Sequence, residues 1–580
     1  MSVLSLQAQW IDLQYDADSS FYTLDSIDYK FPKKGVDSLI MALEIQAVIS
    51  KLREDSYLAA NLDAMKMKND STMEAKVFIG NKLFYGKLNW NGTDEEYLKD
   101  PRIRNIKLDK KGVSAKDINF VIETIREQLD NNGYPLSKIY FENQFVRNDS
   151  LYADIVIEKG ALIRISSIEI KPDSIISPTF IRRFLDLNKD DEFNLEKVLD
   201  IPNQINTLPY LQMSDAPEVK IFGDKTVIDV PIKKRNASRF DFLIGVLPNV
   251  ENPDRFTISG EITADLKNKL KRGEELYFYF RQLRPEAQRM DLRIKYPYLL
   301  GLPFGIHSSF SLYRNGTESR DLNAEGGLEY RTSAFANHIF YTSFQSSRLI
   351  EIDTAAIINS GRLPSSLDVS LNNIAYKFQY DKRDYRLNPR KGLALNAELI
   401  AGIKSIIPNS RITELQSDNF DFSTAYDSLQ LRAVQLTANV DVSYFIPLKK
   451  ASTLKLGNKT GAKYNPTQVF NNELYRIGGS NVLRGFDEES IRAQYYSIFT
   501  AEFRYLLSLN SYFSTFIDYG LTYNEFRPSR VLDFPLGFGV GLSFQTNAGI
   551  FGIDVALGRE QGNPIDFRNT KTHFGFISLF

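Results

Sequence analysis

The stretch VQLTANVDVSYFI, residues 434–446, carries apolar side chains at every second position, with mostly polar ones between them. Successive side chains of a β-strand point to opposite faces of the sheet, so this period of two predicts a strand with two different faces. The same alternation occurs in ELYFYFRQL (275–283), GIHSSFSLY (305–313) and ALNAELIAG (394–402). We therefore predict that the chain beyond residue 235 is all-β.

The length of this part indicates what kind of sheet it forms. Residues 237–580 supply 344 positions, about 21 for each of 16 antiparallel strands with its turn or loop. A tilted membrane-spanning strand needs about 10 residues, so the length fits a transmembrane barrel of about 16 strands at residues 236–580. A soluble propeller is the alternative, but no repeat of about 40–50 residues, the length of a blade, is visible.

The composition excludes several classes of protein. Among 580 residues there are 71 Lys and Arg, 72 Asp and Glu, no Cys and three His, with a net charge of −1. The balanced charge argues against nucleic acid as a partner. The sequence contains no Cys and no G-x-S-x-G motif, and its three histidines are His307, His338 and His573. Few side chains are therefore available to form the active site of an enzyme. We expect no catalytic, cofactor-binding or metal-binding residues.

Residues 20–235 have a different pattern, which repeats. Residues 69–90 and 148–170 share the order of a polar turn, a strand, a glycine turn and a second strand. Helices are predicted at 36–56, 114–132, 177–187 and 195–207. These patterns predict three tandem α+β modules, at 20–90, 91–161 and 162–235. We expect MSVLSLQAQ, residues 1–9, to be the remnant of a signal peptide; a terminus without function is the alternative.

Near the carboxyl end, RIGGSNVLRGF (476–486) precedes YYSIFTAEFRYLL (495–507) and STFIDYG (514–520). This arrangement resembles the BamA/TamA family of outer-membrane barrels, in which an inward loop carries an R-G-F/Y tip and later strands present Glu and F-x-D-x-G. The amino-terminal modules are similar to the family's POTRA domains. The resemblance assigns a loop anchor to Arg484, Gly485, Phe486, Glu502, Asp518, Phe516 and Gly520.

The residues themselves support this interpretation. A guanidinium presents five donors in a planar fork, which two carboxylates on neighbouring strands can satisfy. We therefore predict that Arg484 bonds to Glu502 and Asp518 inside the barrel. The alternative is that Arg484 is a solvated residue of an exterior loop.

A closed barrel requires its first and last strands to pair. We predict a first strand within 238–247 and a last strand within 572–580, whose terminal Phe resembles the recognition signal of outer-membrane barrels, although Ser578 departs from it. If this seam is short or kinked at Gly575, it can open and expose backbone edges. The predicted lateral seam comprises Phe240, Phe242, Gly245, Gly575, Phe576 and Phe580.

The resemblance implies insertion of client barrels into the bacterial outer membrane, or passage of secreted segments through it. The number of modules is closest to the TamA branch. Its implied partners are unfolded client proteins, outer-membrane lipids and a periplasm-spanning partner, with no cofactor. Two alternatives stay open: a two-partner secretion pore, which usually has a plug helix that residues 10–30 do not suggest, and a passive porin or surface-binding barrel.

Overall fold

The computed structural model describes most of the chain. The residues outside the described part are 1–9, 17–20, 25–26, 31–37, 70–71, 91–96, 105–114, 149, 174, 224, 249–255, 285–286, 386–387, 419, 450, 527–528, 547–548, 560–561, 563 and 578–580. The predicted signal-peptide remnant and Phe580 therefore lie outside it. The chain divides into two compact units: Met1–Ser166, Lys189–Leu199 and Ile221–Thr226 form one, and the remaining residues form the other.

The first module packs one helix on a small sheet. Its strands are β1 (Trp10–Asp16), β4 (Asn61–Asn69) and β5 (Thr72–Phe78), in the order β1-β5-β4, with a separate hairpin of β2 (Phe21–Leu24) and β3 (Ile27–Lys30). Helix α1 (Ser38–Glu54) buries Ile45, Ile49 and Leu52 against the apolar face of β5. The spacing of these three residues, four and then three, is that of one helix face.

The strand at 84–90, which the sequence pattern assigns to the first module, belongs to the sheet of the second module. It contains β6 (Phe84–Trp90), η1 (Tyr97–Lys99), α2 (Pro101–Arg104), α3 (Ala115–Asn131), β7 (Lys138–Arg147) and β8 (Ser150–Glu158). Strand β6 pairs in parallel with β8 and not with β4 or β5. The sheets thus divide near Gly80 and not at residue 90, because strand pairing is a long-range property that alternation does not encode.

The third module contains a buried carboxylate, that of Asp229, which is paired with two lysines. It contains β9 (Arg164–Lys171), α4 (Pro178–Leu185), α5 (Leu195–Thr207), β10 (Leu211–Met213), β11 (Glu218–Phe222) and β12 (Lys225–Lys234). Asp229 on β12 is buried, accepts a hydrogen bond of 2.7 Å from Lys171 and pairs with Lys220. The hydrogen bonds from Lys171 and Lys220 lower the pKa of Asp229 below its ordinary value.

This pairing predicts an acid-sensitive third module. Because the pKa of Asp229 is lowered in the folded state, its contribution to stability is present above the ordinary value of 3.8 and is lost as the pH falls through the lowered one. We expect Asp229→Asn to increase hydrogen exchange of the module near neutral pH, and to differ little from wild type at acid pH. Asp215→Asn, at an exposed position of the same module, is the control and is expected to have no effect at either pH.

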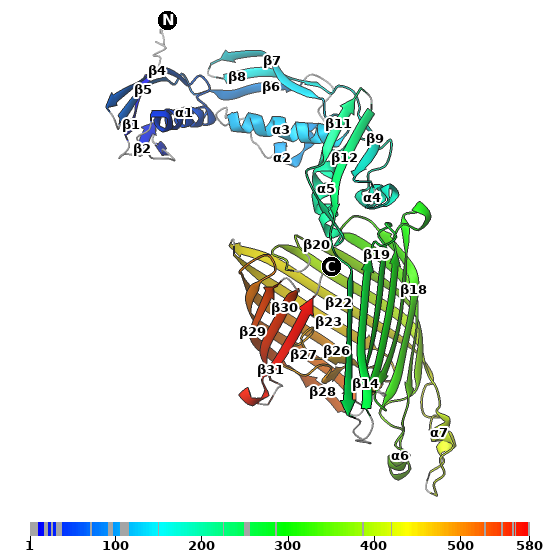
Figure 1. Cartoon of the computed structure of the whole chain (residues 1–580). Helices are drawn as coiled ribbons and strands as arrows, with labels where there is room; N and C mark the ends of the chain where they lie inside the picture. Colours follow the sequence, from blue (N-terminus) through cyan, green and yellow to red (C-terminus); the bar gives the residue numbers. More distant parts are fainter. Residues whose placement is uncertain are drawn as a thin grey trace. The chain divides into compact units, whose positions relative to one another are not determined.

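The remainder of the chain forms one antiparallel sheet whose wall is shown in Figure 1. Its members, in spatial order, are β13 (Arg239–Pro248), β14 (Phe256–Lys267), β15 (Glu275–Arg284), β16 (Ala287–Tyr296), β17 (Phe304–Asn315), β18 (Ser319–Arg331), β19 (Ala336–Leu349), β20 (Val369–Arg383), β21 (Gly392–Ile406), β22 (Arg432–Lys449), β23 (Ser452–Tyr464), β26 (Tyr495–Leu506), β27 (Tyr512–Phe526), β28 (Ser529–Asp533), β29 (Leu536–Gln545), β30 (Ile550–Arg559) and β31 (Lys571–Ile577).

Seventeen strands of the described residues occupy sixteen wall positions. Strands β28 and β29 both pair with β27, one with its end and the other with its beginning. They are therefore a single wall strand that is interrupted at Phe534 and Pro535. Proline cannot donate a ladder hydrogen bond, which explains the interruption. The predicted barrel of about 16 strands is confirmed.

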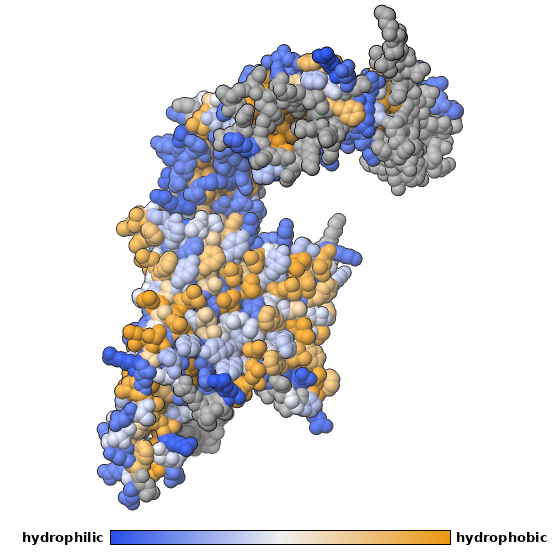
Figure 2. All heavy atoms as spheres, turned by 180° about the vertical axis from the view of Figure 1, so that it is seen from behind, coloured by the Kyte–Doolittle hydropathy of each residue, from blue (hydrophilic) through white to orange (hydrophobic). Residues whose placement is uncertain are grey.

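The two faces of the wall differ as the alternation predicts. On β27 the odd-numbered Phe513, Ile517 and Tyr519 are exposed, whereas the even-numbered Phe516 and Asp518 are buried inside. Hydrophobic side chains are correspondingly frequent on the outer surface of the barrel (Figure 2). An apolar outer face with a polar interior is the arrangement of a membrane-spanning barrel.

Two long connections between wall strands pack together and project beyond the ends of the strands (Figure 1). The connection between β19 and β20 contains α6 (Thr354–Ser360), and that between β21 and β22 contains α7 (Ser410–Thr413) and η4 (Phe422–Thr424). Ile357, Ile412 and Phe422 from these elements share one buried apolar cluster. Two shorter turns, η3 (Leu299–Gly301) and η6 (Phe567–Asn569), follow β16 and precede β31.

Among the described residues, no helix combines the length and apolar character that crossing a bilayer requires.

Candidate functional site: the loop inside the barrel

The connection between β23 and β26 folds back into the barrel. It contains η5 (Asn471–Glu473) and a hairpin of β24 (Tyr475–Ile477) and β25 (Ile491–Ala493). Ile477, Leu483 and Phe486 of this loop are buried in one cluster with Ile498 of wall strand β26. We call residues 465–494 the lumenal loop, because its apolar side chains pack against the wall from within.

Arg484 at the tip of the lumenal loop is held by two wall carboxylates. Its Nε and Nη2 donate to the two oxygens of Asp518 at 2.8 and 2.9 Å, and its Nη1 donates to Glu502 Oε2 at 2.9 Å. The backbone N–H of Arg484 also donates to Asp518, at 3.2 Å. The guanidinium lies 3.4 Å from the centroid of the Phe516 ring. A bidentate pair and a ring face together fix both the position and the plane of the guanidinium.

The wall brings these side chains together by register. Strands β26 and β27 pair with Thr500 opposite Asp518 and Glu502 opposite Phe516. Even-numbered residues of both strands face inward, so the two acids meet on one surface. Arg484, Glu502 and Asp518 are only 9%, 4% and 1% exposed. Buried charges of this kind are tolerated only when each is paired.

A second cation, Arg504, joins the charged side chains of Arg484, Glu502 and Asp518. Arg504 Nε donates to the other oxygen of Glu502 at 2.7 Å, and Thr500 Oγ1 donates to Asp518 Oδ1 at 2.8 Å. Arg504 also donates to Asn388 Oδ1 at 3.2 Å, which connects the group to the connection between β20 and β21. We define the tip cluster as Arg484, Glu502, Arg504, Phe516 and Asp518.

Glycines on the wall allow the loop backbone to approach closely. A Cβ on Gly537 of β29 would lie 2.0 Å from the carbonyl oxygen of Arg484, and one on Gly558 of β30 would lie 2.3 Å from that of Gly485. These two glycines are cross-strand partners. Gly485 itself has a φ of +91°, and a Cβ there would meet the backbone of Leu557 at 2.5 Å. Only glycine fits at these contacts.

This close packing predicts that Gly558→Ala displaces the loop tip. The added methyl must move backbone atoms, and overpacking of this kind typically costs about 1–3 kcal/mol. We expect the variant to form a barrel but to be cleaved faster by a Glu-specific protease in the loop. Gly552→Ala on the same strand is the control, because its Cβ would meet only Gly575 O at 4.0 Å. Equal cleavage of the two variants would contradict the close contact.

The base of the lumenal loop is tied to another part of the wall. Lys404 of β21 is 1% exposed and pairs with Glu473, while Asn472 Nδ2 donates at 2.9 Å to both Ser347 Oγ and Leu367 O. Tip and base are thus held by different strands, β26 to β30 at the tip and β19 to β21 at the base. The loop consequently lies across the interior of the barrel.

The structure places the other predicted anchor residues differently. Phe486 packs in the loop's own apolar cluster and against Gly558. Gly520 does not contact Arg484; its N–H donates to Pro535 O at 2.7 Å, at the interruption between β28 and β29. His307, His338 and His573 lie on strands β17, β19 and β31.

The predicted pairing of the first and last strands is not found. Within the described residues, β13 pairs only with β14 and β31 only with β30, so each is an edge of the sheet. Phe240, Phe242 and Gly245 lie on β13, and Gly575 and Phe576 lie on β31. Gly575 is opposite Gly552 in an uninterrupted register and does not kink the strand. Edge-to-edge pairing depends on the curvature of the whole wall, which local alternation does not specify.

Sequence reasoning missed several residues of the site. Arg504 follows Glu502 by two positions on β26. Residues two apart on a strand lie on the same face, so alternation could have predicted that Arg504 faces inward beside Glu502. The glycines of LGFGVG (536–541) are a signal for close backbone approach. Nothing local indicates Asn388 or Lys404. Asn388 reaches Arg504 from the connection between β20 and β21, and Lys404 reaches Glu473 of the loop from β21. Among the described residues, no group of three or more acidic, His or Cys side chains is placed to hold a metal ion.

Several solved structures are similar to this chain. CdiB from Escherichia coli matches with 11% identity over 92% of this chain and 96% of its own, at a TM-score of 0.50, which shows a common fold. CdiB from Acinetobacter baumannii matches with 16% identity over 86% and 90%, at 0.49. BamA from Haemophilus ducreyi lacking POTRA domains 1–3 matches with 13% identity over 86% and 100%, at 0.45.

A comparison with curated proteins gives no match. The model of the Omp85 superfamily domain matches residues 268–576, which is more than half of the chain. These residues include the lumenal loop, the tip cluster and nearly all of the wall. The chain therefore belongs to the Omp85 superfamily, non-enzymatic barrels of the bacterial outer membrane that assemble or translocate client proteins and carry POTRA domains in the periplasm.

Proposed function

We propose that this protein is a TamA-like assembly factor, which inserts client barrels by pairing their strands with a lateral seam between β13 and β31. The observation that carries the proposal is the pair of sheet edges just described. In lipid, each unpaired backbone group costs several kcal/mol, so a client strand that satisfies these groups is strongly favoured. Addition of a strand to a free edge is a general mode of peptide recognition.

The two edges are unequal, which suits a transient seam. Strand β31 has 7 described residues and β13 has 10, whereas the opposite wall contains strands of up to 18. A short edge forms fewer hydrogen bonds when closed and releases them more readily. Phe240, Phe242 and Phe574 are exposed beside these edges and supply apolar surface for the outer face of an incoming strand.

The modules supply further edges for extended chains. Strand β4 is an edge of the first sheet and β7 of the second, among the described residues. Phe145 and Val146 on β7 are both exposed, with Phe145 stacked on Tyr152 at 4.9 Å. We propose that clients or a periplasm-spanning partner dock on such edges before reaching the barrel. Outer-membrane lipids are the remaining proposed partner.

A two-partner secretion pore is the second candidate, because CdiB shares the fold over most of the chain. The described residues between positions 10 and 30 form strands β1, β2 and β3. A passive porin would need neither the modules nor a loop fixed across its interior.

Depletion of the protein tests the proposal. The outer-membrane proteome is compared before and after depletion, and again after restoring the wild-type chain as the control. Loss of a small set of barrel proteins is the expected result for a TamA-like factor. Loss of a single secreted protein would replace the proposal by a secretion pore, and an unchanged set of outer-membrane proteins would favour a passive barrel.

A further inference from the structure

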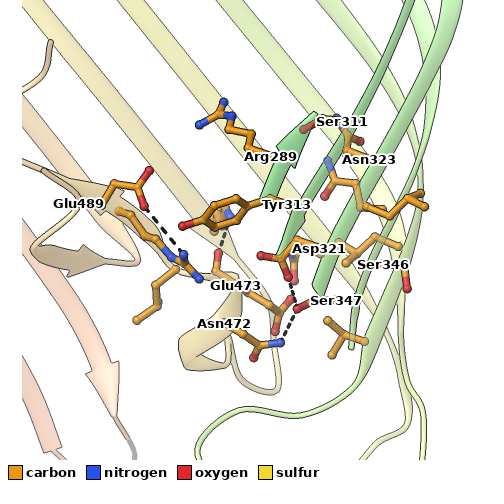
Figure 3. A pocket seen from close by; sticks show the side chains of 18 residues that line it. Arg289, Ser311, Tyr313, Asp321, Asn323, Ser346, Ser347, Asn472, Glu473 and Glu489 are labelled. Carbon is orange, nitrogen blue, oxygen red and sulfur yellow. Dashed lines mark hydrogen bonds and ion pairs between the residues drawn. The ribbon is translucent and has the colours of Figure 1, made fainter. Parts of the chain in front are cut away.

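A polar cavity of about 310 Å³ lies between the base of the lumenal loop and the inner wall (Figure 3). Arg289, Tyr313 and Asp321 reach it from β16, β17 and β18, and Asn472 and Glu473 reach it from the loop. Strand β13 begins where β12 ends, next to the periplasmic module, and strand direction alternates from there. The ends of β16 to β19 that line the cavity are therefore the extracellular ends.

Four buried polar atoms of the lining have no partner among the described residues. They are Asn323 Oδ1, Asn472 Oδ1, Glu473 Oε1 and Arg476 Nη2. Asn472 and Glu473 are each only 8% exposed. An unsatisfied buried polar group is costly, and native structures rarely keep several in one place without a water or ligand to satisfy them.

The charge of the lining favours an uncharged ligand. Its three cations, Arg289, Lys463 and Arg476, are balanced by Asp321, Glu473 and Glu489. The cations are already engaged: Arg289 with Asp291 at 2.9 Å, Lys463 with the carbonyl of Glu473, and Arg476 with Glu489 at 3.9 Å. A negatively charged ligand would be repelled by the three carboxylates, and a positively charged ligand would be repelled by the three basic groups. A ligand of either charge is therefore disfavoured.

We propose that this cavity binds a neutral, polyhydroxylated ligand with the chemistry of a saccharide ring. Hydroxyl groups both donate and accept, so one ring can donate to the Asn323, Asn472 and Glu473 oxygens and accept from Arg476. The ring of Tyr313 adds an aromatic surface, with Arg476 5.5 Å from its centroid. The cavity has room for roughly ten water molecules, or for one to two sugar rings in their place.

The extracellular position allows two sources of the saccharide: the glycan of an outer-leaflet glycolipid, or a free oligosaccharide. The proposal does not rest on the assembly function, because binding is measured on the purified full-length chain without a client. The probes are two neutral saccharides, maltotriose and the outer-core hexose oligosaccharide released from lipopolysaccharide, in a detergent that carries no sugar. Saturation-transfer NMR detects binding of either probe.

Two variants test the site. Ser311→Trp fills the cavity from β17 and is expected to abolish transfer, whereas Ser308→Trp, on the opposite face of the same strand, is the matched control and should keep it. Asn323→Leu preserves volume but removes one of the unpartnered acceptors, and it should weaken binding about tenfold. Heat-modifiable migration on gels verifies that each variant has folded as a barrel.

The outcomes separate the sources. Transfer to the core oligosaccharide, with lipopolysaccharide that co-purifies with wild type but not with Ser311→Trp, identifies a glycolipid ligand. Transfer to maltotriose alone identifies a free oligosaccharide. If neither probe shows transfer that depends on Ser311 and Asn323 in folded protein, the cavity holds water only and the proposal is overturned.

Discussion

Arg484→Ala is expected to leave the barrel folded and to release the tip of the lumenal loop, with a large loss of assembly activity. The substitution leaves Glu502 and Asp518 buried without their shared cation. Removing one partner from such a group typically costs about 3–5 kcal/mol, which is a shift of more than a hundredfold between the attached and released tip. Glu488 and Glu489 lie in the loop, so a Glu-specific protease reports its release.

Two further variants isolate the cause of this effect. Arg484→Lys keeps the charge but lacks the planar fork that bonds to both acids, so it should restore activity only in part. Arg492→Ala removes a cation of the same loop from its pair with Glu318, in which both side chains are more than a third exposed. Exposed pairs contribute about 0–1 kcal/mol, so this control should retain activity and protection. If Arg484→Ala also retains both, the tip cluster has no role in activity.

A disulfide across the seam is expected to abolish client insertion. The chain contains no Cys, so Phe242→Cys on β13 with Phe574→Cys on β31 creates one defined pair. Oxidation would hold the two edges together and exclude a client strand, and reduction should restore activity. Insertion of a client barrel into liposomes under oxidising and reducing conditions measures the effect.

The control introduces a disulfide between β13 and β14, two strands that are already paired. Phe242 and Ile262 are direct partners on β13 and β14, so a disulfide between cysteines at these positions adds no restraint on the seam. This variant should insert clients under both conditions. Full activity of the oxidised β13–β31 pair would show that clients do not enter at the seam, whatever the identity of the clients.

Much of the local structure is predictable from the sequence because its determinants are close along the chain. The helix predicted at 195–207 is α5 with the same bounds, and those predicted at 36–56 and 114–132 differ from α1 and α3 only at their ends. Residues 36, 37 and 114 lie outside the described part, so the comparison at these positions concerns the other ends of the two helices. Strict alternation likewise identified the strands of the wall. The prediction that Glu502 and Asp518 bond to Arg484 inside the barrel came from the resemblance to the family motif and from the chemistry of the guanidinium, and not from alternation.

Interactions between distant segments were not predictable in this way. The strand at 84–90 was recognised, but its partner β8 was not, because a strand's alternation is the same whichever neighbour it pairs with. Nothing near Lys404 indicates that it is buried beside Glu473 of the lumenal loop.

The sequence alone determined the type and order of the elements, the number of wall strands and the chemistry of Arg484 and its acidic partners, since period, turns and charge are local properties. Only the tertiary structure decided which strands pair, that β13 and β31 are the edges of the sheet among the described residues, and which glycines receive the loop tip. Those outcomes depend on the accumulated twist of sixteen wall positions and on contacts between residues far apart in the chain.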